Sequence, residues 1–130
     1  MIGVDTNVVV RLIAADDEQQ TAAALDLMES QGLQVSLLAL LEAEWVLRSA
    51  HGYSRRQTAE AFRGLLALDK VEVDEALHVR WAIDRHEHGA DLADMLLLVA
   101  SRPIGRLATF DRRLTRQAGP DAPVEVVTLS

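Results

Sequence analysis

Apolar residues along the chain occur either in short continuous runs or in longer stretches where they recur every three or four positions. The short runs predict strands and the longer periodic stretches predict helices, bounded by capping residues and glycines. Strands are expected at residues 2–5, 33–36, 71–73, 106–109 and 124–129. Helices are expected at residues 8–14, 16–30, 38–50, 55–68, 74–88, 91–101 and 112–117.

Strands that alternate with helices in this way predict an α/β fold, with a parallel sheet covered by helices on both faces. The chain of 130 residues has no repeats, linkers or low-complexity segments, and we expect one domain over residues 1–130. The first strand, Ile2–Asp5, reads as buried on both faces. Sites in such sheets lie at the carboxyl ends of strands, which is where Asp5 and Asp111 fall.

Composition narrows the class of protein. Hydrophobic residues make up 49% of the chain and aromatic residues only 4%, so the core is expected to be aliphatic. The absence of cysteine excludes disulfides, zinc–thiolate sites and thiol catalysis. Neither a signal peptide nor an apolar run of about 18 residues is present, so we expect a soluble cytoplasmic protein without a membrane segment.

The net charge of −7 argues at first against a nucleic-acid partner. The charge is unevenly distributed, because residues 1–100 hold 17 acids and 8 bases (−9), whereas residues 101–130 hold 3 acids and 5 bases (+2). Arginine favours bidentate contacts with phosphate or carboxylate. The basic segment therefore predicts a patch for phosphate beside Asp111, formed by Arg102, Arg106, Arg112, Arg113 and Arg116.

Four acids occur next to apolar segments, where water is expected to solvate a carboxylate charge poorly. Asp5 ends the first strand and is expected to be poorly solvated, Glu42 lies in an apolar stretch, Asp94 adjoins the run 95–100, and Asp111 follows Phe110. Carboxylates that converge repel one another unless a cation lies between them. Oxygen ligands without sulfur or imidazole favour Mg²⁺ or Mn²⁺ over zinc. The four acids thus predict a metal site and an enzyme.

Each acid also has an ordinary structural explanation. Asp5 and Asp111 stand where helix N-caps are expected, and Asp91 with Asp94 has the spacing of a capping box. Asp91 is interpreted as a cap first and a ligand second. Asn7 adds a neutral oxygen close to Asp5 that is suited to orienting water on a metal.

Glu42 and Glu44 compete for one role. Glu44 precedes Arg48 by four residues, an arrangement that predicts an ordinary surface ion pair. Glu42 has no cationic partner and lies on the apolar face of the helix with Leu38 and Trp45, so Glu42 is the preferred site residue.

Together these motifs resemble the PIN domain, and within it the VapC-type toxins of toxin–antitoxin pairs. The motifs are Asp5-Thr-Asn7, Glu42 ahead of Trp45-Val-Leu-Arg48, Asp91-Leu-Ala-Asp94 and Thr109-Phe-Asp111, and the resemblance spans essentially the whole chain.

The resemblance implies a PIN-like three-layer sandwich and Mg²⁺- or Mn²⁺-dependent cleavage of RNA. It also implies a cognate antitoxin that blocks the site, and frequent homodimers. The implied catalytic and metal-binding acids are Asp5, Glu42, Asp94 and Asp111, with Asn7, Asp91 and Thr109 as helpers. We expect Arg112, Arg113 and Arg116 to bind RNA phosphates.

Three alternatives stay open. A metal-dependent RNA-processing nuclease outside any toxin pair would use the same residues. A phosphatase with Asp5 as nucleophile would need a second aspartate at Asn7 and a late lysine, and the sequence has neither. A non-catalytic relic of the fold that binds partners would have lost one of the four acids, and all four are present.

Overall fold

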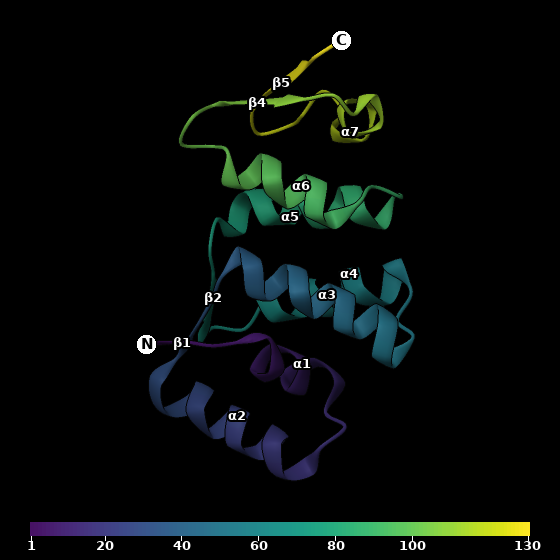
Figure 1. The fold of residues 1–130 in the computed structure, drawn as a ribbon. Helices are drawn as coiled ribbons and strands as arrows, with labels where there is room; N and C mark the ends of the chain where they lie inside the picture. Colours follow the sequence, from purple (N-terminus) through teal and green to yellow (C-terminus); the bar gives the residue numbers. More distant parts are fainter. The chain divides into compact units, whose positions relative to one another are not determined.

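The structure is a computed structural model that describes all residues from Met1 to Ser130. Contacts between residues divide the chain into two compact units, Met1–Ala76 and Leu77–Ser130. Seven helices and five strands follow one another along the chain (Figure 1).

The first unit contains a three-stranded parallel sheet with strand order β1-β2-β3. The register pairs Ile2 with Leu33, and Leu33 with Val71. Helix α1 packs against both α2 and α3, and α4 packs against β3. The elements of this unit are β1 (Ile2–Gly3), α1 (Thr6–Ala14), α2 (Glu18–Gln31), β2 (Leu33–Val35), α3 (Leu37–His51), α4 (Arg55–Leu66) and β3 (Val71–Val73).

The second unit contains two parallel strands, β4 and β5, paired from Arg106 with Glu125 to Thr109 with Thr128. Helix α7 packs against both α6 and β5. The elements of this unit are α5 (Ala76–Glu87), α6 (Leu92–Ala100), β4 (Arg106–Thr109), α7 (Arg112–Ala118) and β5 (Glu125–Thr128). Helix α5 begins at Ala76, the last residue of the first unit.

The predicted α/β class with parallel strands is confirmed, and every predicted helix and strand is present within a few residues of its expected bounds. Polar capping residues explain why the helix ends could be predicted from the sequence. Ser54 and Gln57 form a capping box at the start of α4, and Ser36 caps α3. Gly52 ends α3 in the left-handed conformation that glycine adopts without strain.

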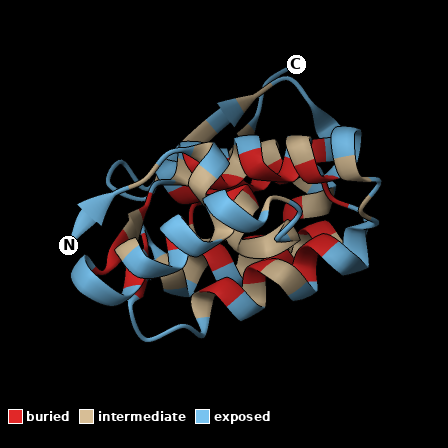
Figure 2. Cartoon of the chain, turned by 90° about the horizontal axis from the view of Figure 1, so that it is seen from below, coloured by how far each residue is buried: buried red, intermediate tan, exposed pale blue.

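The expectation that the first strand is buried on both faces is wrong. Strand β1 has only two residues, both exposed, and Ile2 keeps 39% of its surface accessible. In Figure 2 the strand beside the N-terminus is drawn in the colour of exposed residues. The reason is its place in the sheet of the first unit, where β1 is an edge strand that pairs with β2 alone.

The core is aliphatic, as the composition predicted. Phe62 is the one aromatic side chain among the buried residues, and most of the others are leucine, valine or alanine. Figure 2 shows these buried positions on one face of the helices, with exposed residues opposite. None of the helices combines the length and the apolar character needed to cross a bilayer.

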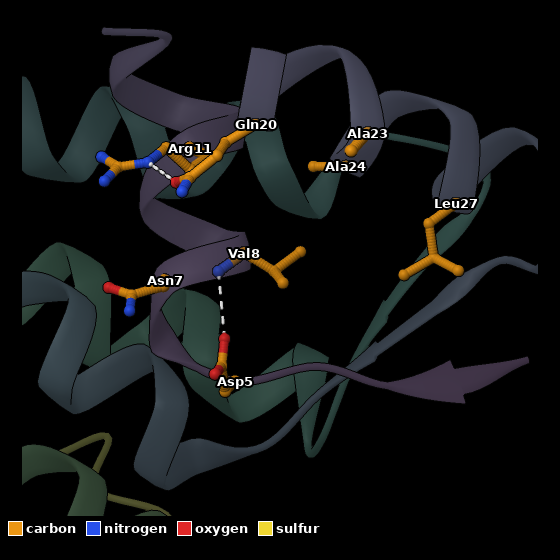
Figure 3. A pocket seen from close by; sticks show the side chains of 8 residues that line it. All are labelled: Asp5, Asn7, Val8, Arg11, Gln20, Ala23, Ala24 and Leu27. Atoms are coloured by element: carbon orange, nitrogen blue, oxygen red, sulfur yellow. Dashed lines mark hydrogen bonds between the residues drawn. The ribbon is translucent and has the colours of Figure 1, made fainter. Parts of the chain in front are cut away.

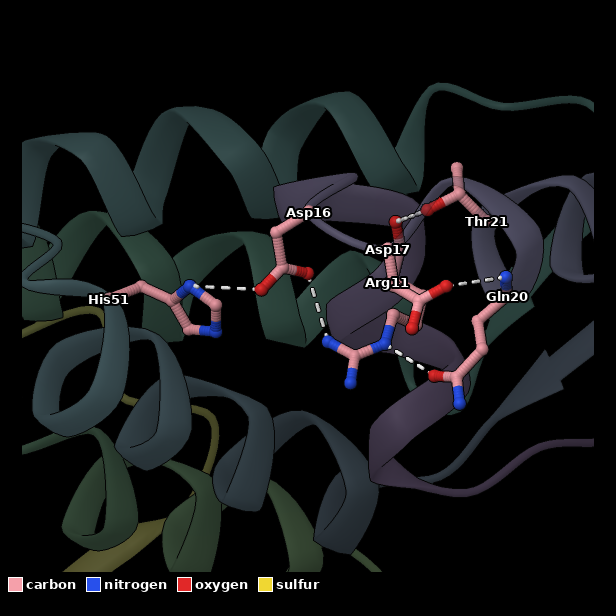
Figure 4. Close-up of polar contacts among 6 residues, drawn as sticks. All are labelled: Arg11, Asp16, Asp17, Gln20, Thr21 and His51. Carbon is pink, nitrogen blue, oxygen red and sulfur yellow. Dashed lines mark hydrogen bonds and ion pairs between the residues drawn. The ribbon is translucent and has the colours of Figure 1, made fainter.

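A polar network holds the start of α2 against the ends of α1 and α3 (Figure 4). Arg11 donates to Gln20 Oε1 over 2.6 Å and to Asp16 Oδ1 over 2.9 Å. A ring nitrogen of His51, the last residue of α3, lies 3.8 Å from the other oxygen of Asp16. The network thus restrains the loop between α1 and α2 through polar contacts.

Candidate active site

Asp5 is the N-cap of α1. Its Oδ1 accepts a hydrogen bond from the backbone N–H of Val8 over 3.2 Å, which satisfies one of the free donors of the first turn. The side chain is exposed, so the expectation of a poorly solvated Asp5 is wrong. Asp5 lies two residues beyond the end of β1, an exposed edge strand, and it stays in contact with solvent.

Glu42 lies on α3 and is tied to α1. The hydroxyl of Thr6 donates to Glu42 Oε2 over 2.9 Å. This contact brings Glu42 next to the residue that follows Asp5, and the two predicted acids of the first unit are therefore neighbours. Sequence reasoning missed Thr6, for which the only signal was its place between the two named residues Asp5 and Asn7.

The face of α3 that carries Glu42 is apolar, as predicted, but it is not covered. Leu38 and Trp45, one turn before and after Glu42, expose 64% and 60% of their surfaces, and Glu42 itself is exposed. The carboxylate of Glu42 is thus accessible to a ligand approaching α3.

The predicted ion pair of Glu44 with Arg48 is confirmed, with 2.9 Å between Oε1 and Nε. The expectation that it is an ordinary surface pair is wrong. The side chain of Glu44 is only 8% accessible, whereas that of Arg48 is 57% accessible. Helix position explains the difference, because Glu44 lies on the buried face with Leu40 and Leu47, and Arg48 extends outward.

Asp91 is the N-cap of α6, as predicted, and its Oδ1 accepts from the backbone N–H of Asp94 over 3.0 Å. Asp94 is half-buried in the first turn. Burial raises the pKa of Asp94 above its ordinary value, the negative charges of Asp91 and Asp111 raise it further, and the positive charge of Arg113 lowers it. Three of the predicted side chains of the second unit therefore act on Asp94.

Asp111 is the N-cap of α7. Its Oδ1 accepts from the backbone N–H groups of Arg113, over 2.8 Å, and Leu114, over 3.4 Å. Thr109, a predicted helper, accepts from the backbone N–H of Asp111 through its hydroxyl oxygen over 2.9 Å. Thr109 thus fixes the turn between β4 and α7 from which Asp111 projects.

The three capping aspartates share one geometry. Asp5, Asp91 and Asp111 each accept their capping bonds through Oδ1, which leaves Oδ2 available for a ligand. A cation fits this donor set, because the free groups are carboxylate oxygens and the charges around Asp94 repel one another.

The structure groups the predicted acids by unit. In the first unit Asp5 directly precedes Thr6, which binds Glu42, and in the second unit Asp91 and Asp111 lie near enough to Asp94 to raise its pKa. Within either unit, no three acids or histidines are grouped so as to hold a metal ion on their own. A cluster of all four acids would draw on both units, and that cluster stays a prediction.

The three arginines predicted to bind RNA lie on α7. Arg112, Arg113 and Arg116 are exposed. Arg113 is near enough to Asp94 to lower its pKa, so part of the basic patch does lie beside the acids of the second unit. Arg106, by contrast, is engaged across the sheet with Glu125 at 3.2 Å.

A pocket of about 370 Å³ opens beside Asp5 in the first unit (Figure 3). It lies between α1 and α2, and sequence reasoning did not predict it. The residues that line it are Asp5, Asn7, Val8, Arg11, Gln20, Ala23, Ala24 and Leu27.

Comparison with known families gives one match: the family model described as PIN domain matches residues 2–120. The match runs through both units and includes every predicted site residue. No curated protein and no solved structure matches the chain.

Proposed function

The chain belongs to the PIN domain family, whose members are generally nucleases, and we propose that it is a divalent-metal-dependent endoribonuclease that acts as the toxin of a toxin–antitoxin pair. The observation that carries the proposal is the placement of Asp94, whose pKa is raised first by burial and then by the negative charges of Asp91 and Asp111. Capping accounts for Asp91 and Asp111, but it does not account for a third, half-buried carboxylate beside them, whose charge a cation would make tolerable.

The residues that would hold the ion are Asp5, Glu42, Asp94 and Asp111. PIN domain nucleases generally use divalent metals, and oxygen donors suit Mg²⁺ or Mn²⁺. Such an ion supplies charge stabilisation at the phosphodiester and lowers the pKa of water.

The chain's own residues would position the reactants. Thr6 holds one oxygen of Glu42, which leaves the other oxygen free to accept a proton from the attacking water. The capping bonds of Asp5 and Asp111 fix the direction of both carboxylates before substrate arrives. Arg112 and Arg116 would hold RNA phosphates on either side of the reacting one.

Thr6 gives this arrangement a separate test. Thr6→Val keeps the shape of the side chain but removes the donor to Glu42. We expect about tenfold slower cleavage, because Glu42 is then held less well in place, and misplacement of a catalytic group can cost up to about a hundredfold in rate. Thermal unfolding of the variant should change little, because the bond is solvent-exposed; a variant that unfolds more easily and cuts normally would make Thr6 structural.

The proposed antitoxin would present a basic side chain to the acids. The chain carries a net charge of −7, and a guanidinium among carboxylates gains charge-assisted hydrogen bonds. Such a partner would displace the ion and inhibit cleavage. We also propose that the protein forms homodimers.

The direct test is incubation of purified protein with structured and single-stranded RNAs, with and without Mg²⁺ or Mn²⁺, followed by mapping of the cut ends. We expect metal-dependent cuts without 2′,3′-cyclic phosphate, because water rather than the ribose 2′-hydroxyl attacks. Asp94→Asn is the inactive control. Metal-independent cleavage with cyclic ends would contradict the proposal, and isolation always without a small basic partner would favour an RNA-processing nuclease.

A further inference from the structure

The pocket between α1 and α2 in the first unit reaches a predicted catalytic acid, Asp5. Its volume of about 370 Å³ lies in the range of sites that bind small organic groups. Asp5 lines it at the start of α1, while Ala23 and Leu27 line it from α2 (Figure 3). Whatever binds Asp5 therefore has this pocket beside it.

The lining combines an apolar floor with a few polar groups. Val8, Ala23, Ala24 and Leu27 supply aliphatic surface. Gln20 receives the Arg11 N–H at its Oε1 over 2.6 Å, which fixes the amide and leaves its NH₂ group free to donate. This is the composition expected where a flat, largely apolar group with polar edges is bound.

The two amides determine which chemistry fits. Asn7 carries both a donor and an acceptor, and no residue of the chain engages its side chain. Amide side chains recognise the edges of unpaired bases, which present adjacent donors and acceptors. Arg11 already donates hydrogen bonds to Asp16 and Gln20, so its side chain is held in place where it lines the pocket.

We propose that this pocket binds one unpaired nucleobase of the RNA substrate, adjacent to the scissile phosphate. The inference rests on the proposed function. A phosphodiester positioned at Asp5 is flanked by two nucleosides, and the pocket that Asp5 lines offers a place for one of their bases. The pocket then favours single-stranded RNA, because a paired base would first have to unpair and unstack before it could enter.

The chain offers matched variants for the test. Ala23 and Ala22 are adjacent exposed alanines of α2, but only Ala23 lines the pocket. Ala23→Leu fills the pocket, and Ala22→Leu adds the same side chain outside it. Gln20→Met and Gln19→Met form a second pair with the same logic, since Gln19 is exposed and does not line the pocket.

The first measurement is cleavage of single-stranded RNA libraries randomised on both sides of the cut. We expect Ala23→Leu and Gln20→Met to lower kcat/KM by about tenfold and to flatten the base preference at one neighbouring position. Ala22→Leu and Gln19→Met should behave as wild type. If all four variants cut with the wild-type rate and preference, the proposal is wrong although the proposed function stands.

The second measurement does not need activity. The four 5′-mononucleotides are titrated into the Asp94→Asn protein, and the methyl signals of Ala23 and Leu27 are followed by NMR. We expect saturable shifts of both signals, and the Leu27 shifts should disappear in the Ala23→Leu background. Absence of shifts with all four nucleotides contradicts the pocket assignment even if wild-type protein cleaves RNA. Shifts in Asp94→Asn together with a wild-type protein that cuts no RNA would support the pocket and overturn the proposed function.

A protein side chain is the competing occupant. If Ala23→Leu left RNA cleavage unchanged but abolished binding of a co-purifying partner, the pocket would belong to that partner and the base assignment would be wrong.

Discussion

Replacing Asp94 by asparagine separates a functional acid from a structural one. Asp94→Asn keeps the size and shape of the side chain and removes its charge. Burial and the charges of Asp91 and Asp111 raise the pKa of Asp94, and Arg113 only partly opposes them. The folded protein therefore tolerates the neutral form better than the carboxylate, and the variant should be more stable near neutral pH.

The size of the gain follows from the interactions that are lost. Each repulsion from Asp91 or Asp111 is a partly exposed pair of charges, for which about 0.2–1 kcal/mol is typical. Loss of the Arg113 attraction subtracts a similar amount, and loss of the anion in the first turn of α6 subtracts about 0.3–1 kcal/mol. Relief of desolvation adds to the gain. We expect a net rise of about 0.5–1 kcal/mol in the free energy of unfolding, which is roughly 2–5 °C in Tm at this chain length.

The pH dependence has a defined sign. Because the folded-state pKa of Asp94 lies above the ordinary value of 3.8, the contribution of Asp94 to wild-type stability is fully present below pH 3.8 and is lost as the pH rises through the folded pKa. The advantage of Asp94→Asn over wild type should therefore vanish toward pH 3.8. It should reach its full size above the folded pKa.

The assay is thermal unfolding of both proteins from pH 3.5 to pH 8, without metal and with Mn²⁺. Asp26→Asn, an exposed substitution on α2 outside the candidate site, is the control for the chemical change alone. Mn²⁺ should stabilise wild type more than Asp94→Asn, because a bound ligand raises stability only in the form that binds it. A variant less stable than wild type by about 1 kcal/mol or more at pH 7, or a difference that does not depend on pH, would refute the reasoning.

Two further predictions concern the other residues of the site. Glu42→Gln should reduce RNA cleavage at least about a hundredfold with little change in Tm, whereas Glu44→Gln should lower stability by about 1–2 kcal/mol and keep its activity per folded molecule. Thermal unfolding followed by circular dichroism, with cleavage rates of both proteins, tests this prediction. The opposite pattern would exchange the roles of the two glutamates. Substitution of both Arg112 and Arg116 by alanine should weaken RNA binding and reduce the slope of log K against log salt concentration by about one unit per lost phosphate contact. Arg56→Ala is the control and should change neither quantity. An unchanged slope in filter-binding assays would show that neither Arg112 nor Arg116 contacts RNA.

The regular elements were predictable because their ends are encoded locally. Ser54 with Gln57, and Gly52 after α3, mark helix ends by hydrogen bonds and backbone conformations that involve only nearby residues. Parallel pairing followed from the alternation of strands and helices. The exposure of β1 was not predictable in this way, because it depends on which strands lie beside Ile2, and an apolar run reads the same at an edge and in the centre of a sheet.

The distinction between Glu42 and Glu44 was only half predictable. Helical spacing correctly paired Glu44 with Arg48, but spacing cannot tell which face of α3 is covered. Apolar residues lie on both faces, since Leu38 and Trp45 are exposed whereas Leu40 and Leu47 are buried. The pocket beside Asp5 escaped prediction for a related reason, because small residues such as Ala23 leave a hollow only where a second helix fails to fill it.

The aspartates show why capping and ligation need not compete as explanations. Sequence reasoning treated a cap as evidence against a metal role, since an N-cap aspartate is accounted for without a ligand. In the structure each capping bond of Asp5, Asp91 and Asp111 uses Oδ1 only. The cap restrains the side chain at no cost to Oδ2, so a capping aspartate is a carboxylate whose direction is already fixed before a cation or substrate binds. A catalytic ligand needs a fixed direction. An aspartate at a helix start obtains that direction from the backbone N–H groups of the next two or three residues, which also favour its negative charge. A stretch of three or four consecutive residues is therefore enough to orient the carboxylate.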